Sequence, residues 1–442
     1  MFTSFTDARS HPGNQGDFVL RFLTLIKKEI TQHVLSYRFI IAVLLCFILI
    51  LTSVTVMLGD YKKRLANYSV NVPKEDENRA IKPPETLSVF AKGLDEGMCR
   101  SFDIWWGWGS INPTSKSQRV NVLFALFATP DFAYIVKSVI SLLAILFAFD
   151  AISGERERGT LSLMLANSVS RGSLLLSKLV GGYISLILPF VLASLFGALF
   201  VSLSPIVSLR SDEWVRLALI FLASLGYIAM FFSLGVLISA MTKQAASSAV
   251  ILLFIWTIIV FAIPNAGTLV AKQIAPMPSV QKLEEEKTQT WIAEIFKLSN
   301  GQTTSLQTAW DEIHDRFVQL EGDYRNKLNR LINLSQNLCR LSPAASYVYI
   351  ATALAQTGIS DEYRYKQAVL RYRTEVFEHG GDYREAKIVR AKNSVDKPRF
   401  GYRRLTLSES IQTISLDVAA ITAFTALFFM GAYLAFLKYD VR

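Results

Sequence analysis

Residues 147–171 read F-A-F-D-A-I-S-G-E-R-E-R-G-T-L-S-L-M-L-A-N-S-V-S-R and lie between two apolar runs, each long enough to cross a bilayer. The first run ends near Asp150, and the next begins near Leu174. Between them, Ser153 to Thr160 form a polar elbow, followed by a short amphipathic helix whose apolar residues are Leu161, Leu163, Met164 and Leu165. A short amphipathic helix tethered between two spans is suited to docking on a soluble partner at the membrane surface.

The polar elbow also has a recognisable form. Asp150-Ala-Ile-Ser-Gly-Glu155-Arg-Glu-Arg-Gly159-Thr160-Leu resembles the cytoplasmic coupling segment of type-2 ABC transporter permeases, which are membrane subunits whose ATPase is usually a separate chain. It is most like the permeases of nitrous-oxide-reductase maturation and gliding-motility systems. The motif indicates the broad family and not the substrate. The alternative is a charged loop that only retains the chain on the cytoplasmic side.

The resemblance implies that this segment couples the permease to its ATPase. The coupling residues would be Ser153, Gly154, Glu155, Arg156, Glu157, Arg158, Gly159, Thr160 and Leu161. Among them, we expect Glu155, Arg156 and Arg158 to make charge contacts with the ATPase. Gly159 and Thr160 would form the bend and the helix cap. The second span and an N-terminal elbow helix would carry the motion outward.

The composition fits membrane spans combined with a polar domain. Of 442 residues, 51% are apolar, and the mean hydropathy is +0.33, between the values typical of pure membrane bundles and of soluble proteins. The net charge is +10, and in a membrane protein basic residues near span ends set topology. Without zinc-like Cys/His spacing or an RNA-binding aromatic motif, we expect the lipid bilayer and no nucleic acid as a partner.

The hydropathy pattern predicts an all-α membrane protein with six transmembrane helices. The predicted spans are residues 39–57, 130–150, 174–203, 213–241, 245–264 (closed by Pro264) and 413–437. Residues 1–38 form the cytoplasmic N-terminus, in which 17–37 have the apolar spacing of an amphipathic elbow helix, or of an ordinary soluble helix. The polar stretch 1–16 is not a signal peptide. Residues 151–173 form the coupling segment.

The first polar excursion, residues 58–129, is expected to be loop with limited helix. Trp105, Trp106 and Trp108 fit an interfacial aromatic belt, or alternatively a ligand platform. Residues 120–128 are apolar but too short to cross, which indicates a buried or re-entrant piece. Thr129-Pro130-Asp131 predicts a helix start with Thr129 as N-cap.

The second excursion, residues 265–412, is domain-sized and is predicted to be mainly helical. Residues 304–341 have the spacing of one long amphipathic helix, either alone or in a hairpin. Ser342-Pro343 predicts a second helix, and Ser360 caps a third through His379. Residues 341–358 also resemble the permease family, and their small and apolar residues indicate packing against the membrane domain.

The distribution of Lys and Arg predicts the orientation. With six spans and a cytoplasmic N-terminus, the cytoplasmic side holds most of the basic residues of the short loops, including Lys27, Lys28, Arg156, Arg158 and Lys243. The basic residues Lys62, Lys63 and Arg64 would favour a cytoplasmic position for the first excursion, but basic residues in long loops have less influence on orientation. We therefore expect a multi-pass protein of the bacterial inner membrane with both termini cytoplasmic and both excursions extracytoplasmic.

Few residues carry obvious chemistry. Lys137 is the ionisable residue expected well inside a span, where it must snorkel or find a partner. Cys46 lies in the first span. Cys99 and Cys339 fall in the two excursions, where an oxidising compartment would allow a disulfide; two unrelated thiols are the alternative.

No P-loop G-x-x-x-x-G-K-[ST] is present, nor are G-x-S-x-G or H-E-x-x-H, and the four histidines are scattered. We therefore expect a non-enzymatic chain that binds no cofactor and no metal, with ATP and Mg²⁺ on a separate ABC ATPase subunit. The resemblance implies a second permease subunit, either the same chain or a similar paralogue.

Three functions remain open at this point. The chain is a permease of an ATP-driven exporter, a non-transporting subunit that transmits force to a periplasmic partner protein, or a membrane scaffold or receptor without an ATPase. A neighbouring gene for a P-loop ATPase would exclude the third. An apolar or electrostatically uniform cavity between the spans would favour the first over the second.

Overall fold

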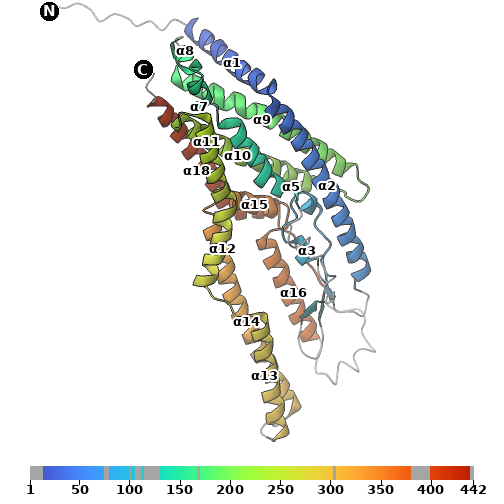
Figure 1. Cartoon of the computed structure of the whole chain (residues 1–442). Helices are drawn as coiled ribbons and strands as arrows, with labels where there is room; N and C mark the ends of the chain where they lie inside the picture. The colour runs from blue at the N-terminus through green and yellow to red at the C-terminus, as the bar shows by residue number, and fades with distance from the viewer. Residues whose placement is uncertain are drawn as a thin grey trace, which may run out of the picture.

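The computed structural model describes residues 13–73, 79–99, 101–104, 111–113, 130–166, 170–301, 305–379 and 399–438. The molecule is elongated, and its long helices run roughly along one axis (Figure 1). At one end lie α7 (Ser153–Glu157) and α8 (Thr160–Ala166), and at the other a hairpin of α13 (Val280–Ser299) and α14 (Leu306–Cys339) projects. We call these the α8 end and the hairpin end.

Six helices among the described residues are long and apolar enough to cross a membrane, which confirms the predicted fold class. The first, third, fourth and sixth are α2 (Tyr37–Asn71), α9 (Arg171–Ser202), α10 (Ser211–Met241) and α18 (Leu407–Leu437). The second comprises α5 (Phe132–Ile135), the π-helix η2 (Val136–Ile140) and α6 (Ser141–Ala148). The fifth comprises α11 (Ala245–Thr257), the π-helix η3 (Ile258–Ala262) and α12 (Ile263–Ile274).

Two spans continue as helix beyond their predicted ends. The helix α2 has 35 residues, or about 52 Å at the α-helical rise, so its last turns extend past the hydrocarbon core into the predicted loop. The helix of the fifth span does not end at Pro264. The wider turns of η3 come directly before this proline, and such π-turns change the backbone pairing that a proline would otherwise break.

The second span begins at a different cap from the one predicted. Asp131, and not Thr129, is the N-cap, because its Oδ1 accepts a hydrogen bond from the backbone N–H of Tyr134 at 2.7 Å. Its Oδ2 accepts a second bond from the N–H of Lys92 at 2.8 Å. Asp131 therefore precedes the helix and fixes its start to the segment that contains Lys92.

The helix α1 (Gly13–Val34) packs against α9 at the α8 end. At the hairpin end, α14 packs against both α13 and α12. The helix α15 (Pro343–Leu354) has Ser342 as N-cap, as predicted, and packs against the spans α10 and α18. The helix α16 (Ile359–His379) begins one residue before the predicted cap Ser360, which lies in its first turn.

The polar segment before α5 contains a small sheet, which the sequence did not predict. Its antiparallel strands β1 (Arg79–Ala80), β2 (Phe102–Ile104) and β3 (Ile111–Pro113) pair in the order β1-β2-β3, with Ala80 opposite Phe102. The 3₁₀ helix η1 (Thr86–Val89) and α3 (Asp95–Met98) lie between β1 and β2. The predicted tryptophan belt (Trp105, Trp106 and Trp108) and the apolar piece 120–128 lie outside the described residues.

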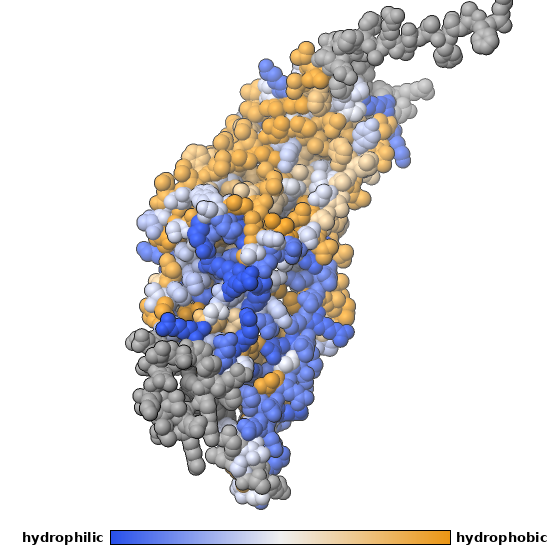
Figure 2. Space-filling view, turned by 180° about the vertical axis from the view of Figure 1, so that it is seen from behind, coloured by the Kyte–Doolittle hydropathy of each residue, from blue (hydrophilic) through white to orange (hydrophobic). Residues whose placement is uncertain are grey.

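The main apolar core fills the space between the spans, and α15 belongs to it through Tyr347, Ile350 and Leu354. The surface divides along the same axis. Figure 2 shows apolar side chains over the half of the molecule toward the α8 end and hydrophilic side chains toward the hairpin end. The exposed apolar residues on the spans include Ile48, Leu188 and Leu222, as a lipid-facing surface requires.

Candidate functional site

The coupling segment begins at a point where two serines join it to α10. The backbone N–H groups of Ile152 and Ser153 both donate to Ser239 Oγ, each at 3.0 Å. The Ser153 hydroxyl donates to the carbonyl of Phe149 at 2.9 Å, and both serines are fully buried. The start of α7 is therefore bonded directly to the last turn of α10.

Arg156 and Glu157 hold the turn between α10 and α11. The Arg156 guanidinium donates to the carbonyls of Thr242 at 2.8 Å and Ala240 at 3.3 Å, where an α-helix leaves carbonyls unpaired. Glu157 Oε2 accepts from the N–H of Ala245 at 3.2 Å, the first residue of α11. Both charges favour their helix ends, since a cation suits a C-terminus and an anion an N-terminus.

Glu155 lies in a buried cluster of three charges. Lys178 Nζ lies 2.5 Å from Glu155 Oε1 and 3.1 Å from Glu29 Oε1, so it joins α7 and α1 to α9. All three residues are at least nine-tenths buried. Gly181 on α9 permits this approach, because a Cβ there would lie 2.7 Å from Glu29 Cβ.

The residues after Glu157 face outward. Arg158, Gly159, Thr160 and Ser162 are exposed, and Leu163 is 68% exposed, whereas Leu161 is fully buried. Gly159 has φ +71°, a backbone conformation that favours glycine, and it separates α7 from α8. Thr160 Oγ1 donates to the carbonyl of Glu155 at 3.3 Å.

The predicted coupling residues thus divide into two groups. Ser153, Gly154, Glu155 and Leu161 are buried, and Arg156 makes internal hydrogen bonds to α10. Of the three charges expected to meet an ATPase, only Arg158 is exposed, although its Nε also donates to the carbonyl of Gly154 at 3.0 Å. Sequence spacing did not distinguish these groups, because the partners Lys178, Ser239 and Thr242 come from other helices.

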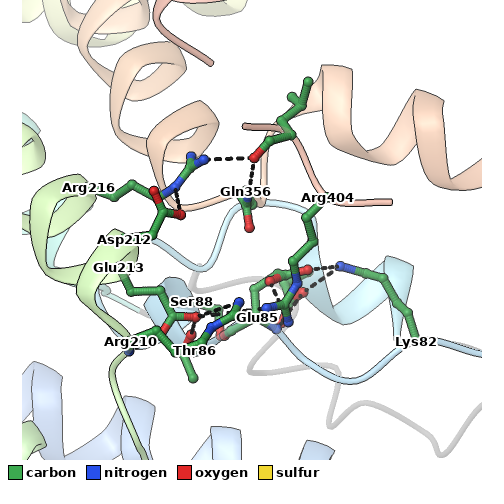
Figure 3. Close-up of polar contacts among 12 residues, drawn as sticks. Lys82, Glu85, Thr86, Ser88, Arg210, Asp212, Glu213, Arg216, Gln356 and Arg404 are labelled. Carbon is green, nitrogen blue, oxygen red and sulfur yellow. Dashed lines mark hydrogen bonds and ion pairs between the residues drawn. The ribbon is translucent and has the colours of Figure 1, made fainter. Parts of the chain in front are cut away.

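A second polar cluster, which the sequence did not reveal, lies at the end of α10 that is directed toward the hairpin end, and Figure 3 labels its members Lys82, Glu85, Arg210, Glu213 and Arg404. We call it the outer charge network. Its members alternate in sign along a series of ion pairs, and they are Asp60, Arg64, Asp95, Lys82, Glu85, Arg404, Glu213 and Arg210. The network therefore joins α2, the segment 79–99 and the approach to α18 with the start of α10.

The ion pairs in the centre of the network involve Lys82, Glu85 and Arg404. Lys82 Nζ is 2.9 Å from Glu85 Oε1 and 3.6 Å from Asp95 Oδ1. Arg404 Nη2 is 3.1 Å from Glu85 Oε2. Burial acts against the charged form of Lys82, but Glu85 and Asp95 outweigh it and raise the pKa of the ammonium. Burial raises the pKa of Glu85 in spite of Lys82 and Arg404.

Arg216 lies beside the network in the second turn of α10 and is 1% exposed. Its Nε donates to Asp212 Oδ2 at 2.8 Å, and its Nη2 donates to the carbonyl of Leu405 at 2.7 Å. Its Nη1 donates to Ser410 Oγ at 2.9 Å and to the carbonyl of Leu354 at 3.4 Å. One guanidinium therefore binds α10, the end of α15 and the start of α18.

Lys178, Arg216 and Asp417 also lie within span helices, and their side chains are nearly fully buried. Asp417 accepts both Nε and Nη2 of Arg340, at 2.9 and 3.1 Å. The ammonium of Lys137 itself lies 4.8 Å from the ring centroid of Tyr134. A basic residue in an apolar helix was the available signal, since such a charge requires a partner.

Cys99 and Cys339 are free thiols in this structure, as is Cys46. Cys339 precedes α15 and donates to the carbonyl of Pro264 at 3.3 Å. The segment before Cys99 contacts the other end of α15, where the N–H of Leu94 donates to the carbonyl of Thr357 at 2.8 Å. The 12 residues of α15 span about 18 Å, whereas a disulfide needs Cα atoms within about 7 Å.

Comparison with known proteins identifies the family. The family model for the ABC-2 family transporter protein matches residues 23–441, nearly the whole chain. The chain belongs to the ABC-2 transporter family. This ABC-2 protein is also 32% identical over 128 residues to the probable ABC transporter permease protein NosY of Stutzerimonas stutzeri, a match that covers 27% of the chain and 43% of that relative.

The family confirms the predicted recognition as a type-2 ABC permease. Together with the six apolar helices, it makes this ABC-2 protein a multi-pass membrane subunit of an ABC system. Within the described residues, no group of three or more His, Cys, Asp or Glu side chains could hold a metal ion. The residues of the two polar clusters make contacts between helices that are distant in sequence.

Proposed function

We propose that this chain is the permease subunit that couples ATP hydrolysis on a separate ATPase chain to movement of its spans and of its hairpin-end domain. By this domain we mean the segment 79–99 together with α13, α14 and α16. One observation carries the proposal. Arg158, Gly159, Thr160, Ser162 and Leu163 are exposed to solvent. Glu155, Arg156 and Glu157 fasten the base of this segment to four helices: α1, α9, α10 and α11. A docking surface with a rigid base is what the transfer of a displacement requires.

The proposal includes an orientation. The α8 end lies in the bacterial cytoplasm with both termini, and the hairpin end lies outside the inner membrane. The exposed basic residues Lys27, Lys28, Arg158 and Lys243 at the α8 end support it, because basic residues of short loops stay in the cytoplasm. An ATPase with its ATP and Mg²⁺ can reach the segment only from that side.

In the proposed mechanism, ATP binding closes two ATPase subunits, and each displaces one coupling segment. Two permease subunits, identical or paralogous, complete the assembly. Each segment moves as a unit with α1, because Lys178 bonds Glu155 to Glu29. No step of this mechanism needs a catalytic group on the permease itself.

Two outputs of the motion are compatible with this coupling. One is export of a substrate, and the other is force transmission to a periplasmic partner protein. The second has specific support, since α15 is buried among the spans and joins them to the hairpin-end domain. A scaffold without an ATPase is the third alternative and has no support from the family.

The test is a pull-down of the tagged chain from detergent, scored for a stoichiometric ATPase and its ATP turnover. In the double variant Arg158→Glu/Leu163→Glu, we expect at least a tenfold loss of bound ATPase with unchanged thermal unfolding, because both side chains are exposed. The matched control is Ile292→Glu on α13, which changes an apolar residue of 54% exposure at the other end. Undiminished binding in the double variant would refute the docking surface.

A further inference from the structure

The helix α10 is bonded directly to both polar clusters described above. We infer that α10 carries the displacement of the coupling segment to the hairpin-end domain, and that Arg216 is the positioning residue that fastens its far end. This inference rests on the proposed function and adds the route of the motion. The sequence had suggested the second span and the elbow helix for this role.

At the α8 end, α10 has direct contacts with the coupling segment. Ser239 accepts the N–H groups of Ile152 and Ser153, and Arg156 donates to the carbonyls of Ala240 and Thr242. These bonds reach both the start of α7 and its last turn. A displacement of α7 therefore acts on the end of α10 without an intervening element.

At the hairpin end, α10 is bonded to the parts of the domain that lie beyond it. Arg216 binds the last turn of α15 and the start of α18, and the N–H₂ group of Gln356 donates to the same Leu405 carbonyl at 2.7 Å (Figure 3). Glu213 accepts the Thr86 hydroxyl and lies 3.9 Å from Arg404. Since α16 follows α15 directly, a shift of α10 would move the base of α16.

The middle of α10 is also attached to α15. The Tyr227 and Tyr347 rings stack with centroids 4.6 Å apart, and the Ser224 and Tyr347 hydroxyls are 2.9 Å apart. The Tyr227 hydroxyl donates to the carbonyl of Lys137 in η2 at 3.0 Å. On α10, the attachment to α15 through Arg216 and the attachment through Tyr227 lie about three turns apart. Two such attachments oppose rotation of α10 relative to α15.

The helix α10 has a regular backbone, as do α2 and α18, whereas the other three spans are interrupted. The second and fifth spans contain the π-turns η2 and η3, and α9 contains Pro189 within the helix. Such turns and prolines are the usual places where helices bend. α10 is one α-helix of 31 residues without proline, about 46 Å long, so it transmits an axial displacement with less bending.

The chemistry of arginine explains the residue at position 216. A planar guanidinium presents several donors in fixed directions, whereas a lysine ammonium is a single compact charge. Arg216 uses this geometry for a carboxylate, a hydroxyl and two backbone carbonyls on three helices or helix ends. Its replacement would leave buried acceptors of α15 and α18 unpaired and would loosen the joint.

The first experiment uses the permease alone, with its three native cysteines replaced by alanine. Spin labels at Leu222→Cys on α10 and Arg371→Cys on α16, both exposed positions, report the distance between these helices. We expect a narrow distance distribution in the parent chain and at least a twofold broader one in Arg216→Met. Arg330→Met, the same substitution at an exposed position on α14, is the control and should leave the width unchanged.

The second experiment uses the assembled complex with its ATPase. On ATP binding, the label at position 371 should move relative to a label at the exposed position Leu188→Cys on α9, which has no member in the outer charge network, while its distance to position 222 stays constant. Arg216→Met should reduce the first change at least twofold while ATPase binding persists. Should that variant not fold, Ser410→Ala and Asp212→Asn each remove one Arg216 contact, and each should give an intermediate broadening.

The outcomes separate the two levels of the proposal. A full ATP-dependent change in Arg216→Met, or an ATP-dependent change between positions 222 and 371 in the parent chain, would overturn the route through α10. If the distance distribution has the same width in the parent chain and in Arg216→Met, Ser410→Ala and Asp212→Asn, Arg216 does not fasten the end of α10. A parent chain that assembles with no ATPase would instead refute the proposed function, and the first experiment would still decide the fastening.

Discussion

The coupling segment and the outer charge network are attached to the two ends of α10 by different chemistry. At the α8 end, the coupling segment is joined to α10 by hydroxyls, backbone N–H groups and an arginine on helix carbonyls. At the hairpin end, a series of buried ion pairs joins α10 to α2 and to the segment 79–99.

The difference has a physical consequence. A hydrogen bond to a neutral group contributes about 1 kcal/mol and can be exchanged for another partner. Removal of one member of a buried ion pair costs about 3–5 kcal/mol, because the other charge remains without compensation. The contact between the coupling segment and α10 is therefore less costly to break than the outer charge network at the other end of α10.

The largest expected effect is at the hairpin end. Asp95 is fully buried between Arg64 and Lys82. Asp95→Ala leaves two buried cations, and we expect the free energy of unfolding to fall by about 4 kcal/mol, measured by denaturant titration in detergent. The neighbouring Glu96→Ala is the matched control, since that side chain is 49% exposed. Equal losses in the two variants would contradict the greater cost of breaking the outer charge network.

The second-largest expected effect is a change of stability with pH, which depends on Asp361. Asp361 is buried, and burial raises its pKa from 3.8 to about 6. Its Oδ2 accepts the N–H of Gly358 at 3.2 Å, whereas its Oδ1 has no hydrogen-bond partner within the described part of the chain. Lys82, Glu85 and Arg216 are the nearby charges that influence it.

The sign follows from the raised pKa of this acid. The folded state binds the proton of Asp361 more tightly than the unfolded state does. The contribution of Asp361 to the free energy of unfolding is therefore highest below about pH 4 and falls as the pH rises to about 6. Asp361→Asn should remove this fall and be about 2 kcal/mol more stable than the parent at pH 7.5, with little difference near pH 4. Asp323→Asn, an exposed aspartate on α14, is the control. A constant difference at all pH values would contradict the prediction.

The smallest effect on stability is expected at the α8 end. Ser239→Ala removes an acceptor of two backbone N–H groups, and we expect a loss of about 1–2 kcal/mol. Under the proposed function, ATP turnover would continue while the ATP-dependent change at the hairpin end decreases. Ser247→Ala, at an exposed position on α11, is the control. A loss of stability as large as that of Asp95→Ala would remove the distinction between the two ends.

The sequence predicted a helix or its cap correctly where the pattern of residues within that helix was sufficient. The long amphipathic helix α14 and the Ser342 cap of α15 follow from periodicity and capping chemistry, which depend on residues within a few turns. The helix through Pro264 was missed because the π-turn that precedes it has no clear sequence signal.

The candidate site was predicted less completely. The coupling motif was found, but Glu155 and Arg156 were taken for surface charges. Lys178 bonds Glu155 to Glu29, which lies 149 positions away in sequence, and such a partner cannot be read from spacing. Arg216 was overlooked for the same reason, since its acceptors Leu354 and Ser410 lie 138 and 194 positions away.

The sequence by itself therefore determined the six spans, the long helix α14 and the resemblance of residues 150–161 to a coupling segment, because hydrophobic length, helical periodicity and a short motif are local properties. The tertiary structure decided which charges of that motif face solvent, and it bonded α10 to both polar clusters. A buried charge is stable only with a partner of opposite sign or several hydrogen bonds. Those partners are supplied by helices that are distant in sequence and become neighbours only when the bundle has packed.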